Sequence, residues 1–107
     1  MRLKDFIKEI ENQDIKKEIR MSCMGYKDTQ KYPEDSLPIT MGLYDEGLEV
    51  EVEWDYKSKT TLEDFWDLIN NNGVVEDSVM MYSVDVDDGN IIYFKRVVIS
   101  QNYIILV

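Results

Sequence analysis

The amino-acid sequence predicts an α+β fold with two helices and six or seven mainly antiparallel strands. Two apolar stripes have the period of a helix, and each is followed by segments in which apolar and polar residues alternate. The chain has 107 residues, of which 44% are apolar and 11% aromatic, enough for one small core. We therefore expect a single domain, residues 1–107.

The first element is expected to be a short amphipathic helix that ends near Asn12. Its apolar residues recur at positions i, i+3, i+4 and i+7 of one helix face: Leu3, Phe6, Ile7 and Ile10. From residue 18 the period changes to two, which predicts a strand. The apolar side of that strand consists of Ile19, Met21 and Cys23.

Two further strands are expected around a short turn. They cover residues 39–44 and 48–54, and Asp45, Glu46 and Gly47 form the turn between them. Before them, residues 25–38 contain both prolines and no apolar periodicity, which predicts a long loop.

A second helix is expected to begin after Thr61, because Thr61 and Asp64 have the spacing of a capping box. Its buried stripe consists of Leu62, Phe65, Trp66 and Ile69. Three asparagines and a glycine at 70–73 are expected to end it, since these residues tolerate the left-handed cap.

The remaining strands lie in the last third of the chain. One strand is predicted from the alternation of Met80, Tyr82, Val84 and Val86. A hairpin turn around Asp88 and Gly89 ends it. Residues 91–99 and 103–107 complete the set of strands.

The two helix-and-strand cycles have two interpretations. At an offset of 59 positions, six residues are identical: Leu3, Asp5, Phe6, Ile10, Asn12 and Met21 match Leu62, Asp64, Phe65, Ile69, Asn71 and Met80. A pseudo-duplicated α-β-β unit, with halves 1–57 and 60–107, is one interpretation. Convergence is the other, because helix starts reuse Asp and helix stripes reuse Leu, Phe and Ile.

Acidic residues are concentrated in one part of the chain. Residues 1–31 contain eight Lys or Arg and six Asp or Glu, whereas residues 32–107 contain four and sixteen. Two windows, 33–56 and 60–94, each hold eight carboxylates and no cation. Such a surface repels nucleic acid and anionic membranes and attracts cationic patches on other proteins.

The chain lacks the residues on which most catalytic sites depend. It has no histidine, one cysteine and no Gly-rich phosphate loop. We therefore expect no enzymatic activity, no cofactor and no metal ion. The single cysteine, together with the absence of an apolar signal segment or membrane span, predicts a cytoplasmic protein.

A metal-dependent nuclease is the enzyme alternative. Asp45 followed by Asp55, Tyr56 and Lys57 has the form of sites in which carboxylates hold Mg²⁺ and Lys steadies the attacking water. An acidic body, however, would repel a nucleic-acid substrate. Residues 85–90 resemble a calcium loop only in part, because the glycine comes one position early and Arg96 replaces the last ligand.

A row of carboxylates on one predicted strand is the sharpest candidate site. Glu49, Glu51 and Glu53 alternate with apolar residues, so they would lie about 6.6 Å apart on one face at ~3.3 Å per residue. The solvated face of an ordinary half-buried strand is the alternative. The candidate partner-binding site adds the acidic extensions of the row and two anchoring tyrosines: Tyr44, Asp45, Glu46, Glu49, Glu51, Glu53, Asp55 and Tyr56.

Residues 1–14 resemble the opening of small acidic type II-A anti-CRISPR proteins carried by prophages. The shared pattern is a short amphipathic helix with Asp-x-Ile-x-Glu-Ile-x-Asn-x-Asp spacing. The resemblance implies an acidic α+β protein that blocks a Cas nuclease by occupying its DNA-reading surface. It assigns no binding residue, and this chain departs from the family by ending in apolar strands rather than acidic helices.

These features predict a non-enzymatic acidic inhibitor that mimics DNA at a cationic nucleic-acid-binding site of another protein, such as a bacterial defence nuclease. The expected partner is a basic protein surface, possessed by a Cas nuclease among others, with no direct contact to nucleic acid or membrane. Two alternatives stay open. One is an immunity or antitoxin protein for a basic nuclease toxin, and the other is a phage or mobile-element accessory domain whose acidity only maintains solubility.

Overall fold

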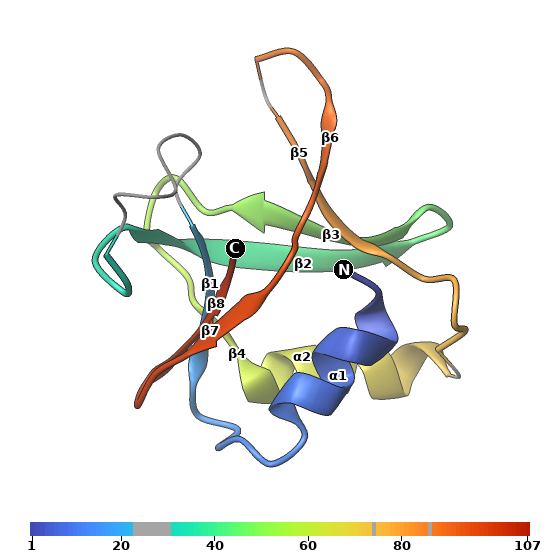
Figure 1. The fold of residues 1–107 in the computed structure, drawn as a ribbon, viewed down its shortest axis with the longest axis horizontal. Coiled ribbons are helices and arrows are strands. Elements are labelled where there is room, and N and C mark those ends of the chain that lie inside the picture. The colour runs from blue at the N-terminus through green and yellow to red at the C-terminus, as the bar shows by residue number, and fades with distance from the viewer. Residues whose placement is uncertain (23–30, 74, 86) are drawn as a thin grey trace.

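The computed structural model describes residues 1–22, 31–73, 75–85 and 87–107. They form two helices and one curled mixed sheet, which confirms the predicted α+β fold (Figure 1). The helices are α1 (Leu3–Ile10) and α2 (Leu62–Asn72). The strands are β1 (Glu18–Ser22), β2 (Ser36–Tyr44), β3 (Gly47–Val52), β4 (Thr60–Thr61), β5 (Met81–Val84), β6 (Ile91–Tyr93), β7 (Val97–Ile99) and β8 (Tyr103–Leu106).

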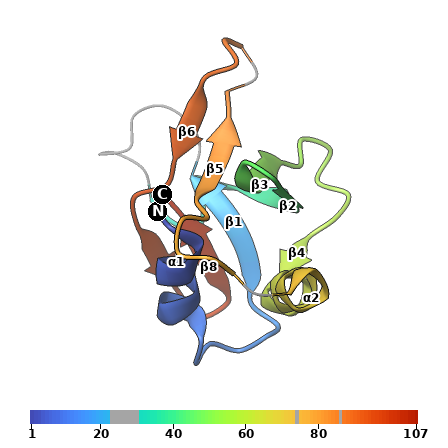
Figure 2. The ribbon, with the colours of Figure 1, turned by 90° about the vertical axis from the view of Figure 1, so that its right-hand side faces the viewer.

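The strands follow the order β6-β5-β3-β2-β1-β8-β7, and β4 pairs separately with β1. The β1–β8 and β3–β5 pairs are parallel, and the other described pairs are antiparallel. The two helices lie side by side below β2 and β3 in Figure 1. The β5–β6 hairpin extends beyond the rest of the sheet in that view and in Figure 2.

Each helix buries three of the four residues of its predicted stripe, and the fourth, Ile7 or Trp66, is partly buried. In α1, Leu3, Phe6 and Ile10 are buried. The α2 capping box is present: the Asp64 amide donates to the Thr61 hydroxyl at 3.3 Å, and the Thr61 amide donates to the Asp64 carboxylate at 2.9 Å. The helix runs to Asn72 and ends at a glycine with a φ of 85°.

One hydrophobic core joins the segments 1–57 and 60–107. Phe6 of α1 and Phe65 of α2 meet edge to face, with ring centroids 5.1 Å apart. The strand pairs β5–β6 and β7–β8 flank the strands of the first segment on opposite sides. The two segments therefore complete a shared sheet rather than two separate ones.

β2 is longer than predicted because it changes partner along its length. Its first three residues pair with β1, and Ile39–Tyr44 pair with β3. Pro38 lies at the change, a position that suits a residue without an amide hydrogen. The predicted loop over 25–38 is therefore wrong for residues 36–38, and residues 25–30 and Cys23 lie outside the described ranges.

The predicted strand over 91–99 is two strands in the structure. β6 pairs with β5 at one edge of the sheet, and β7 pairs with β8 at the other. The chain passes between them at Phe94, whose side chain is buried. Lys95 and Arg96 lie at the break, but two charged residues within an apolar segment do not show that the strands on either side pair with different partners.

Candidate protein-binding surface

β3 directs alternate side chains to opposite faces, and Glu49 and Glu51 lie on the outer face, away from the core. Glu53, predicted to continue this row, lies beyond the end of the strand. Its carboxylate accepts hydrogen bonds from the Asp55 amide at 3.2 Å and the Ser58 hydroxyl at 3.3 Å. The row therefore consists of two strand carboxylates and a third that stabilises the following turn.

Two more predicted site residues form the β2–β3 hairpin loop. Asp45 and Glu46 stand between the paired residues Tyr44 and Gly47, and both carboxylates are exposed. A loop of two residues keeps the strands in register and holds both acidic side chains at one end of the outer face.

The outer face also carries tyrosines from distant parts of the chain. Glu49 pairs with Tyr82 of β5, and Tyr82 pairs with Tyr93 of β6, so the three side chains lie in one row across three strands. The ring of Tyr44 lies over Gly42, where an added Cβ would come within 2.8 Å of it. We call this surface the tyrosine–glutamate face: Tyr44, Glu46, Glu49, Tyr82 and Tyr93.

Tyr82 is the buried centre of this face, and the rings around it are exposed. It is 7% exposed, compared with 57% for Tyr44 and 50% for Tyr93. Burial, followed by the nearby carboxylates of Glu49 and Glu46, raises the pKa of the Tyr82 hydroxyl above its usual value. The sequence analysis missed Tyr82 and Tyr93 as site residues, because their place beside Glu49 depends on the pairing of β3 with β5.

The predicted anchors Tyr44 and Tyr56 lie at opposite ends of β3. A strand of this length spans roughly 17 Å. Tyr56 is exposed, has a φ of 55°, and belongs to the segment after β3 together with Asp55. The structure therefore brings Tyr44, Asp45, Glu46 and Glu49 together and leaves Asp55 and Tyr56 apart from them.

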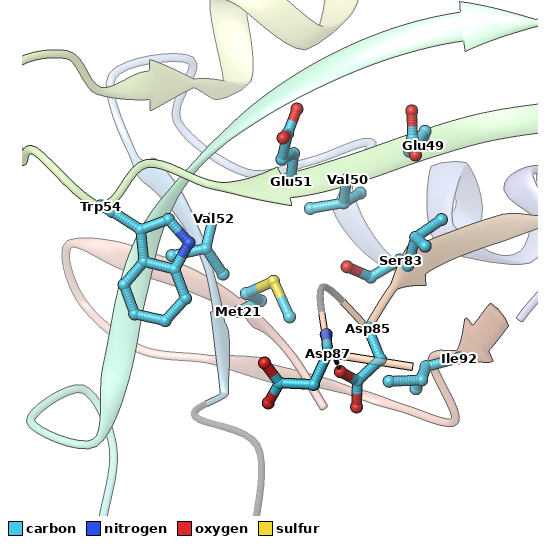
Figure 3. A pocket seen from close by; sticks show the side chains of 11 residues that line it. Met21, Glu49, Val50, Glu51, Val52, Trp54, Ser83, Asp85, Asp87 and Ile92 are labelled. Atoms are coloured by element: carbon cyan, nitrogen blue, oxygen red, sulfur yellow. Dashed lines mark hydrogen bonds between the residues drawn. The ribbon is translucent and has the colours of Figure 1, made fainter. Parts of the chain in front are cut away.

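β3 and β5 separate after two paired positions and leave a cavity of about 360 Å³ (Figure 3). We call it the β3–β5 cleft. Val50 and Val52 line it on the β3 side, and Ser83 and Ile92 line it on the hairpin side. Met21 of β1 lies between the two sides in Figure 3.

Charged and aromatic side chains surround the mouth of this cleft. Asp85 and Asp87 come from the β5–β6 hairpin, whereas Glu51 of β3 directs its side chain to the outer face (Figure 3). Trp54, which is 62% exposed, stands at the end of β3 (Figure 3). The cleft is thus apolar inside and acidic at its mouth.

Few of the acidic side chains are neutralised within the molecule. Ion pairs among the described residues join Arg2 to Asp5, Lys4 to Asp77 and Arg20 to Glu18. All sixteen carboxylates of residues 32–107 lie in the described ranges, and Asp77 alone among them pairs with a described cation. The acidity predicted from the sequence is therefore largely uncompensated at the surface.

The geometry does not assemble the nuclease arrangement. Asp45 lies before β3 and Asp55 lies after it, too far apart to hold one ion. No group of three or more metal-ligating side chains occurs in the described ranges. In the calcium-like segment, the Asp85 amide donates to the Asn90 carbonyl at 2.9 Å, and the Asp88 carboxylate accepts from the Asn90 amide, so these described residues form turn contacts.

Comparison of the chain with protein-family models, with curated proteins and with solved structures returns no match. Among the described residues, no helix is both long enough and apolar enough to span a membrane.

Proposed function

We propose that this protein is a non-enzymatic acidic inhibitor that occupies a cationic, nucleic-acid-binding site of another protein. One observation carries the proposal: fifteen of the sixteen carboxylates of residues 32–107 have no cationic partner among the described residues. Uncompensated charge of one sign attracts a surface of the opposite sign over long range and speeds association.

The tyrosine–glutamate face supplies the contact surface in this proposal. Glu46, Glu49 and the adjacent Glu51 would bind the Lys and Arg side chains that otherwise hold phosphates. Tyr44 and Tyr93, both half exposed, would pack against the partner, since tyrosine is enriched in protein interfaces. The buried Tyr82, the strand partner of Tyr93, would fix the position of the surface that these rings present.

A bacterial defence nuclease, such as a Cas nuclease, is one partner of the required chemistry. The resemblance of residues 1–14 to anti-CRISPR proteins adds little to this choice. The apolar residues of that pattern belong to α1, where Phe6 and Ile10 are buried in the core. Partner choice therefore depends on the acidic surface.

Charge reversal at the face tests the proposal. The variant Glu49→Lys/Glu51→Lys is compared with Glu63→Lys/Asp67→Lys, which changes the net charge equally on the exposed side of α2. Each tagged protein is used to capture partners from bacterial lysate at ~0.05 M and ~0.5 M salt, which bracket weak and strong screening. Captured proteins are identified, and their binding to labelled DNA or RNA is measured with and without inhibitor.

We expect the unchanged protein to capture a nucleic-acid-binding protein at low salt and to displace its nucleic acid. The β3 variant should lose this displacement at least tenfold, because each close charge pair at an interface contributes a kcal/mol or more. The α2 variant should retain most of it. Equal behaviour of the two variants, or a partner that keeps its nucleic acid, would contradict the proposal.

A further inference from the structure

We propose that the β3–β5 cleft binds an extended peptide segment that carries lysine or arginine, by adding it as a strand to the open edge of β3. This inference rests on the proposed function, because the segment would belong to the cationic partner. The contact at the cleft would be additional to that at the tyrosine–glutamate face. It would be more specific, because it depends on backbone pairing.

The edge of β3 that faces the cleft is unpaired at Val52, beyond its pairing with β5. The Leu48 amide donates to the Met80 carbonyl at 2.9 Å, and on the other side the Glu53 amide donates to the Pro38 carbonyl at 2.8 Å. Backbone groups alternate in direction along a strand, so those of Val52 point to the same side as those of Leu48. The pairing with β5 ends at Glu49, and no described strand covers the Val52 amide and carbonyl.

An open strand edge of this kind accepts a further extended chain through main-chain hydrogen bonds. The partner strand β5 diverges into the projecting hairpin, so the space beside Val52 is a cavity rather than packed side chains. The edge is short, and a guest segment needs only a few residues to cover it.

Ser83 contributes a polar atom to the otherwise apolar interior of the cleft. This residue is 6% exposed. In Figure 3 the hydroxyl oxygen points into the cavity, on the side of Met21. A guest amide or ammonium group would bond to this hydroxyl in place of water.

The charges at the mouth select a basic guest. Asp85 and Asp87 stand at the mouth on the hairpin side, and neither carboxylate pairs with a described cation. Val52 and Ile92 would contact the aliphatic part of a lysine or arginine side chain. The exposed ring of Trp54 offers a cation–π contact to the charged end.

The test uses synthetic peptides and the complete chain. The probe is a fluorescein-labelled hexapeptide of alternating lysine and valine. A second probe has the same charges, but N-methyl groups block its backbone donors on alternate residues. Binding is followed by fluorescence anisotropy at ~0.15 M salt, where exposed charges are screened beyond about 8 Å. Amide NMR shifts report which residues of the protein contact the peptide.

We expect the unmodified peptide to bind and to shift the amide resonances of Val52 and Ser83. The N-methylated peptide should bind at least tenfold more weakly, because it cannot pair with a strand edge. The variant Asp85→Asn/Asp87→Asn should lose about tenfold in affinity, because it removes two charge-assisted contacts to the peptide. The matched variant Glu63→Gln/Asp67→Asn, which removes the same charge from α2, should bind normally.

Equal binding of the two peptides would show attraction by charge alone and would overturn the cleft proposal. Absence of any binding, or shifts confined to the tyrosine–glutamate face, would overturn it as well. Neither result touches the proposed function, which the β3 charge-reversal variant tests separately. Conversely, peptide binding by a chain that captures no nucleic-acid-binding protein would support the cleft and contradict the proposed inhibitor.

Discussion

A single glycine controls how the hairpin of the tyrosine–glutamate face lies against β5. Gly47 has a φ of 138°, and a Cβ added there would lie 2.5 Å from the Met80 carbonyl oxygen and 3.4 Å from the Tyr82 ring. Both the backbone conformation and the close approach therefore require glycine. Any other residue at position 47 would push the β2–β3 hairpin, and Glu46 with the hairpin, away from Tyr82.

Tyr82 gives this face a pH dependence at alkaline pH. Its hydroxyl has a pKa raised above 10.0, chiefly by burial and then by Glu49 and Glu46. The folded state thus favours the neutral phenol. This contribution to stability is complete below pH 10 and is lost as the pH rises through the pKa of the folded state.

We therefore expect the unfolding free energy of Tyr82→Phe to rise relative to that of the unchanged protein as the pH increases from 8 to 11. The phenylalanine variant has no phenol to ionise in the unfolded chain, so it escapes the alkaline loss. Urea unfolding between pH 8 and pH 11 measures this. Tyr56→Phe is the matched control from an exposed position, and the same pH profile for both variants would refute the explanation.

At the scale of elements, β1 is buried on both faces, although its sequence predicts one polar side. Glu18 and Ser22 are buried in the curled sheet, where β1 pairs with β8 along one edge and with β4 and then β2 along the other. Arg20 compensates for the burial of the Glu18 carboxylate. It donates to the Glu18 carboxylate at 3.1 Å and to the Ser36 hydroxyl at 2.9 Å, and it lies 5.6 Å from the centre of the Tyr103 ring.

Arg20→Ala should destabilise the protein by roughly 3 kcal/mol, because it leaves the Glu18 carboxylate buried without its partner. Urea unfolding at pH 7 measures the loss. Arg2→Ala, which breaks the exposed pair with Asp5, is the control and should leave the unfolding midpoint nearly unchanged. Adding Glu18→Gln to Arg20→Ala should recover part of the stability. No recovery would mean that lost packing, not the unpaired charge, causes the effect.

At the scale of the whole molecule, the fold concentrates charge of one sign without internal compensation. The net charge is −10, and the carboxylates lie on the hairpin loops, on the outer face of β3 and on the exposed side of α2. Like charges repel most in the compact state, so this distribution lowers stability while it favours a cationic partner.

Moderate salt should therefore stabilise this protein. Raising sodium chloride from ~0.02 M to ~0.2 M shortens the screening length from about 20 Å to about 7 Å and weakens the repulsion. We expect the melting temperature to rise by a few degrees, and we expect a smaller rise for Glu49→Lys/Glu51→Lys, which has less repulsion to screen. A melting temperature that falls with salt would show that attractive ion pairs dominate instead.

Residues close together in the sequence were sufficient to predict the helices and the turns. The stripe of Leu3, Phe6 and Ile10 and the capping box of Thr61 and Asp64 depend only on residues within one or two helical turns. The hairpin loop after Tyr44 is equally local. The same is true of the outward position of Glu49 and Glu51, which follows from alternation along one strand.

The sequence by itself therefore determined the α+β class, both helices, the hairpin loops and the acidity of the outer face. Only the tertiary structure decided that β5 pairs with β3, that residues 91–99 divide between two edges of the sheet, and that β1 is buried on both sides. These outcomes placed Tyr82 and Tyr93 beside Glu49 and opened the cleft beside Val52. The physical reason is that alternation specifies the two faces of a strand but not its neighbours, which are set by contacts between segments far apart in the chain.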